Sequence, residues 1–74
     1  MNKPLLLEQL ESVRARVEAA RLETLIHQQI VAELERQGRD ASAAKVKLNT
    51  WKMAEQKLIL QMNSILDRLD KTSR

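Results

Sequence analysis

The 74-residue chain contains no cysteine, phenylalanine or tyrosine, and its one aromatic residue besides histidine is Trp51. Without cysteine it can form neither a disulfide nor a thiolate metal site. With one aromatic residue, any core must be built from Leu, Ile, Val, Met and Ala. Together with many Glu, Gln, Lys and Arg, this composition is typical of long helices rather than strands. The composition therefore predicts an all-α protein.

Glycine and proline each occur once, and the single glycine excludes a glycine-rich phosphate loop. Gly38 follows a long stretch without a helix breaker, and it can adopt the left-handed conformation that closes a helix. Asp40 can then accept hydrogen bonds from the first free amides of a second helix. We therefore predict one domain, 1–74, comprising a helix over 4–37, a turn over 38–40 and a helix over 41–71.

No apolar run is long enough for a signal peptide or a membrane span. The three leucines near the start are followed directly by Glu8, and the uncharged stretch 58–66 contains polar residues. A spanning helix needs about 20 consecutive apolar residues. We therefore expect a cytoplasmic protein with no membrane span.

Both predicted helices carry a row of residues spaced alternately by four and three, which is the spacing of a seam between two packed helices. In the first helix the row is Leu6, Leu10, Val13, Val17, Ala20, Thr24, His27, Val31 and Leu34. In the second it is Ala44, Leu48, Trp51, Glu55, Leu58, Met62, Ile65 and Leu69. When the chain folds back at Gly38 the rows meet in order, and the polar layer Thr24, His27, Trp51 and Glu55 comes together. The pattern predicts an antiparallel two-helix hairpin of coiled-coil type.

Each predicted helix also carries a second apolar row away from this seam. The first helix has Ala15, Ala19, Leu22, Ile26 and Ile30, and the second has Val46, Met53 and Leu60. In a lone hairpin these rows would face water, and each large side chain would forfeit about 1.5–3 kcal/mol of burial. We therefore expect self-association through the first row, with a homodimer that forms a four-helix bundle favoured. The second row is the expected contact for a protein partner.

Residues suited to catalysis or metal binding are sparse. The serines have no base at helical spacing, so no catalytic residue and no cofactor is predicted, and the chain is expected not to be an enzyme. Glu23, His27 and Glu55 could approach one another as metal ligands, but their pattern is not repeated and lacks a fourth ligand. The favoured interpretation, which includes no metal site, is that His27 packs beside Trp51 while Glu55 bonds Thr24 or His27 and sets the register.

The net charge of +3 is unevenly distributed along the chain. Residues 1–37 carry five basic and six acidic side chains, whereas 38–74 carry eight basic and four acidic ones. A basic half can indicate nucleic-acid binding, and Lys45, Asn49 and Lys52 form a thin version of a DNA-reading surface. A solvated surface of mixed charge is the simpler interpretation. We therefore expect a small interaction or assembly module that self-associates and binds a protein, with a nucleic-acid-associated regulator as the alternative.

The stretch 29–40, QIVAELERQGRD, is followed by Ala44, Leu48 and Trp51. It resembles the hinge pattern I-V-x-E-L-E-R-x-G-x-D of small uncharacterised bacterial proteins that are frequent in alphaproteobacteria. Those relatives commonly have phenylalanine where this chain has Trp51, and a histidine in the second helix. Because that family has no assigned activity, the resemblance implies a helical hairpin and adds no catalytic or ligand residue.

Overall fold

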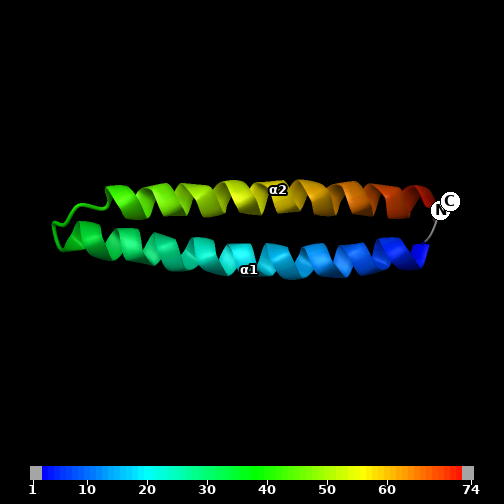
Figure 1. The fold of residues 1–74 in the computed structure, drawn as a ribbon, viewed down its shortest axis with the longest axis horizontal. Coiled ribbons are helices and arrows are strands. Elements are labelled where there is room, and N and C mark those ends of the chain that lie inside the picture. The colour runs from blue at the N-terminus through cyan, green and yellow to red at the C-terminus, as the bar shows by residue number, and fades with distance from the viewer. Residues whose placement is uncertain (1–2, 73–74) are drawn as a thin grey trace.

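The structure is a computed structural model that describes residues 3–72. Two helices, α1 (Lys3–Arg36) and α2 (Ser42–Thr72), are joined by residues 37–41. They lie antiparallel and side by side, so both described ends of the chain lie at the same end of a rod that measures 56 × 14 × 14 Å (Figure 1). The predicted all-α antiparallel hairpin is confirmed. Each helix end falls within one residue of its predicted position, and residues 1–2 and 73–74 of the predicted domain lie outside the described residues.

Gly38 ends α1 in the left-handed conformation, with a φ of 69°. Its amide donates to the carbonyl of Glu35 at 3.0 Å, and the amide of Arg39 donates to the carbonyl of Leu34 at 2.9 Å. These are the two hydrogen bonds of a Schellman cap, which satisfies carbonyls that the end of a helix leaves free. A Cβ atom added to Gly38 would meet nothing within 4 Å. Glycine is therefore required there for its backbone conformation and not for lack of space.

Asp40 caps the start of α2, as its position after the glycine predicts. Its Oδ1 atom accepts hydrogen bonds from the hydroxyl of Ser42 at 2.6 Å and from the amide of Ser42 at 3.0 Å. These two bonds, with a smaller contribution from the charge of Lys45, lower the pKa of Asp40 from its ordinary value. Lys45 Nζ also lies 3.1 Å from Glu35 Oε2, an ion pair that joins the two helices beside the turn.

The interface between the helices is formed by the two rows that the spacing predicts. Every member of both rows is buried or half-buried, and Val17 is only 3% exposed. A core cluster of Leu10, Val13, Val17 and Ile65 has four further residues packed against it, Leu58, Ile59, Met62 and Leu69. Leu10 and Leu69 belong to the same packed group, as the predicted antiparallel register requires.

The core of the isolated hairpin is small compared with the apolar surface left outside it. Among residues 3–72, eight hydrophobic residues are buried and ten large hydrophobic residues are exposed. No large side chain in this part of the chain is less than 2% exposed. Below about 70–80 residues a single core rarely supplies more than ~3–5 kcal/mol. A partner that covers the outer surfaces would therefore add substantially to the stability of this fold.

No helix in the described part of the chain is both long enough and apolar enough to cross a membrane.

Candidate interaction surfaces

The polar layer of the seam brings His27 of α1 beside Trp51 of α2. Their ring centroids lie 6.4 Å apart and the rings are tilted by 34°. His27 Nδ1 lies 2.7 Å from the carbonyl oxygen of Glu23. Because a carbonyl oxygen can only accept, Nδ1 is the donor in this hydrogen bond. The backbone of α1 therefore orients the imidazole ring, and packing against Trp51 accounts for its position in the seam.

Thr24 and Glu55 are the other members of this layer. The sequence suggests that they bond to each other, but each has a different partner. The hydroxyl of buried Thr24 donates to the carbonyl of Ala20 at 2.9 Å. Glu55 Oε2 instead lies 3.5 Å from Nε of Arg21 on α1. Threonine can bond the carbonyl four residues earlier in its own helix without any alignment between helices. Glu55 is therefore left to pair with a residue at the flank of the seam.

The same contacts bear on the metal interpretation of Glu23, His27 and Glu55. Glu23 Oε2 lies 3.7 Å from His27 Nδ1, but that nitrogen already donates to a carbonyl. Glu55 forms its ion pair with Arg21. Within residues 3–72 no three His, Asp or Glu side chains come together as a metal-binding group. The geometry thus gives this interpretation no support.

The α1 outer face is the name we give to Ala15, Ala19, Leu22, Ile26 and Ile30. All five are exposed, with Leu22, Ile26 and Ile30 at 59%, 41% and 43%. The neighbouring Leu25 is exposed as well and widens this surface. Four large apolar side chains within nine residues make a concentrated patch on the half of α1 nearer the turn.

The α2 outer row is the name we give to Val46, Met53 and Leu60, which are 67%, 56% and 68% exposed. A spacing of seven residues places successive members about 10.5 Å apart along the helix. The row lies on α2 across from the seam, and the α1 outer face lies on α1 across from the same seam. The two surfaces therefore point away from each other, and one docked partner on one side cannot cover both.

The predicted nucleic-acid edge, Lys45, Asn49 and Lys52, is exposed but does not concentrate free positive charge. Lys45 is paired with Glu35 across the turn. The side-chain amide nitrogen of Asn49 lies 3.8 Å from the sulfur of Met53, a weak acceptor to which it donates. Two of the three side chains thus already have partners within the hairpin.

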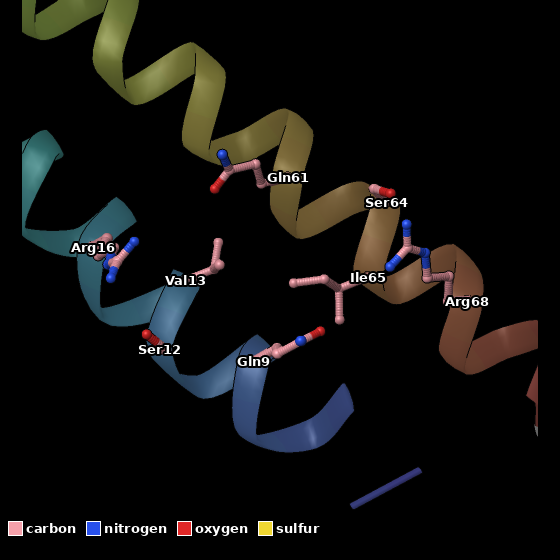
Figure 2. Close-up of a pocket in the computed structure, with 8 residues that line it drawn as sticks. All are labelled: Gln9, Ser12, Val13, Arg16, Gln61, Ser64, Ile65 and Arg68. Atoms are coloured by element: carbon pink, nitrogen blue, oxygen red, sulfur yellow. The ribbon is translucent and has the colours of Figure 1, made fainter. Parts of the chain in front are cut away.

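A pocket of about 370 Å³ lies between the helices in the half of the hairpin that holds the chain ends. Val13 and Ile65 face each other between the helices, and polar side chains surround them (Figure 2). These are Gln9, Ser12 and Arg16 from α1 and Gln61, Ser64 and Arg68 from α2. None of the six belongs to a predicted interface. The signal that could have found them is a repeated pattern, Gln-x-x-Ser-Val/Ile-x-x-Arg, which occurs over 9–16 and again over 61–68.

Comparison with protein-family models, with curated proteins and with solved structures gave no match. The resemblance of the hinge to small bacterial proteins therefore stays an expectation from the sequence.

Proposed function

We propose that this chain is a non-enzymatic interaction module that self-associates through the α1 outer face and binds a protein through the α2 outer row. The observation that carries the proposal is the excess of exposed over buried large apolar side chains in residues 3–72. Soluble chains rarely leave extended apolar patches in water unless these patches contact another surface. The closed twofold dimer is the commonest arrangement for a single chain type.

The composition of the α1 outer face favours contact with a second α1. Leu22 and Ile26 supply apolar area, while Ala15 allows two helix backbones to approach closely. Burying the remaining exposed part of each large side chain contributes about 1 kcal/mol, which is roughly half of the value for full burial. A twofold contact gains each of these contributions twice, which favours a second copy over a chemically unrelated occupant.

The α2 outer row stays accessible in such a dimer because it points the other way. Its three apolar side chains in line, at a spacing of two helical turns, match the apolar stripe of an amphipathic partner helix. The module therefore has one surface for self-association, the α1 outer face, and a separate surface for a protein partner, the α2 outer row.

Sedimentation velocity of the purified chain at micromolar concentration tests the self-association. We expect a species of twice the 8.5 kDa chain mass. Ile26→Glu should convert it to a folded monomer, since the new charge would be buried at the contact. Gln28→Glu is the matched control, because it introduces the same charge on an exposed α1 position outside the α1 outer face. A well-folded monomer for the unmodified chain would reject the assembly role.

A nucleic-acid-associated regulator is the second candidate, and the basic balance of residues 38–74 is the observation that favours it. It requires retention on DNA or RNA at low salt that weakens as salt rises. Lys52→Gln should reduce that retention further, whereas an absence of retention at low salt would exclude this function.

A further inference from the structure

The pocket between the chain-end halves of α1 and α2 is built from two copies of one pattern. Gln9, Ser12 and Arg16 on α1 correspond in kind and spacing to Gln61, Ser64 and Arg68 on α2. Because the helices are antiparallel, the two copies are related by a local twofold axis that passes between Val13 and Ile65. Figure 2 shows these two apolar side chains directed toward each other, with the polar groups around them.

The charge in this pocket is of one sign. Its lining includes two arginines and no acidic residue. The ion pairs of residues 3–72 involve Arg21, His27, Arg36, Lys45 and Lys71, so neither Arg16 nor Arg68 has an acidic partner there. A guanidinium presents a planar fork of donors that matches the two oxygens of a carboxylate or phosphate. Two such forks without a partner in one acid-free pocket favour an anionic ligand.

The spacing of the two arginines indicates how many anionic groups the pocket can take. Arg16 lies three residues beyond Val13, and Arg68 lies three residues beyond Ile65 in the opposite direction along the rod. At a rise of 1.5 Å per residue their Cα atoms are therefore separated by about 9 Å along the axis. Packed helices add a further ~8–10 Å across the seam. This diagonal separation suits one oxyanion group at each fork, and the Ser and Gln side chains supply neutral hydrogen bonds between them.

We propose that this pocket binds a small molecule that carries two oxyanion groups, as a diphosphate or a dicarboxylate does. Each arginine holds one group in a bidentate contact, and Ser12 and Ser64 donate to the oxygens that remain. The site differs from the surfaces assigned to self-association and to a protein partner. None of its lining residues belongs to the α1 outer face or to the α2 outer row, although Ala15 of the α1 outer face is the neighbour of Arg16. The large side chains of that face, Leu22, Ile26 and Ile30, lie nearer the turn.

Titration of the isotopically labelled chain, followed by the NMR shifts of its backbone amides, tests the site. Inorganic pyrophosphate and succinate are the two probes, added separately at low ionic strength. We expect saturable shifts confined to residues 9–16 and 61–68 for at least one probe, and the probe that binds identifies the ligand as a diphosphate or a dicarboxylate. Arg16→Gln or Arg68→Gln should each weaken binding about tenfold or more, as loss of a charge-assisted hydrogen-bonded pair does.

Arg14→Gln is the matched control, because Arg14 is exposed on α1 but does not line the pocket. It should weaken binding clearly less than Arg16→Gln does, because it removes the same charge at a position that forms no bidentate contact with the ligand. Arg16→Lys keeps the charge without the planar fork and should also weaken binding. Circular dichroism checks that each variant keeps its helical content.

Three outcomes would overturn the proposal. The first is the absence of a saturable shift with either probe at millimolar concentration. The second is an equal loss of affinity in Arg14→Gln and Arg16→Gln, which would mean that only the net charge matters. The third is a change in sedimentation for Arg16→Gln or Arg68→Gln with no anion bound, which would make the pocket a contact between copies of the chain.

Discussion

Replacing Gly38 by alanine should destabilise the hairpin, and the structure isolates the cause. Gly38 has a φ of 69°, and a Cβ atom there would meet nothing within 4 Å. Steric contact with the rest of the protein therefore contributes nothing to the cost. What remains is the intrinsic cost of the left-handed conformation for an L-residue, about 1–2 kcal/mol. Alanine also restricts the unfolded chain, which offsets about 0.4–1 kcal/mol of this cost. We expect a net loss of about 1 kcal/mol.

Urea denaturation followed by circular dichroism at one fixed protein concentration measures this loss. The fixed concentration matters because a self-associating chain has a stability that depends on it. Gly38→Asn should cost less than Gly38→Ala, because asparagine visits the left-handed region more readily. The slope of the transition should not change, since the surface exposed on unfolding is the same.

A chain synthesised with D-alanine at position 38 is the sharpest control. A D-residue prefers the positive φ that Gly38 adopts, so the conformational cost disappears while the restriction of the unfolded chain remains. The variant should therefore be more stable than the natural chain, by about 0.4–1 kcal/mol. If L-alanine is as well tolerated as glycine, or if D-alanine is the more damaging of the two, the left-handed cap does not hold this turn and our reasoning is wrong.

Three further predictions concern the cap, the core and the flank of the seam. Asp40 has a lower pKa in the folded chain than its ordinary value of 3.8. Its contribution to the free energy of unfolding is therefore complete above pH 3.8 and is lost as the pH falls through the folded pKa. Urea midpoints measured from neutral pH to pH 3 should show this loss in the natural chain but not in Asp40→Asn, which caps without titrating. Val17→Ala should lower the free energy of unfolding by about 2 kcal/mol, since Val17 is 3% exposed. The same change at exposed Val46 should alter it by no more than about 0.5 kcal/mol. Urea denaturation of the unassociated chain measures both. A double-mutant cycle with Arg21→Ala and Glu55→Ala should give a coupling energy below about 1 kcal/mol, because Arg21 is exposed. A larger coupling energy would mean that a partner shields the ion pair from water.

Most of the fold could be read from the chain because its determinants act over short distances. Gly38 and Asp40 shape the turn through bonds to residues three and two positions away. The rows that contain Val17 and Ile65 follow from the periodicity of a helix, which places residues three and four apart on one side. The exposure of the α1 outer face and of the α2 outer row follows from the same periodicity. Their roles in self-association and partner binding stay predictions.

The partners of individual polar side chains could not be read in this way. The spacing predicts that Glu55 bonds Thr24 or His27, but both of these bond carbonyls of their own helix, and Glu55 pairs with Arg21. The charge pattern places Lys45 on a nucleic-acid edge, yet Lys45 forms an ion pair with Glu35. Which of several nearby groups a long side chain meets depends on small differences in distance and orientation, and the spacing of residues along the chain does not contain them.

By itself, the sequence determined where this protein bends, which residues of each helix face inward and in what order they meet. Helix caps and helical periodicity are local properties, and antiparallel pairing at one turn leaves a single register for two matched rows. Only the tertiary structure decided which side chains pair across the flanks of the seam. It also decided that Arg16 and Arg68, 52 positions apart in the chain, line one pocket. That pocket exists only once two separate helices lie side by side, because each helix supplies half of its lining.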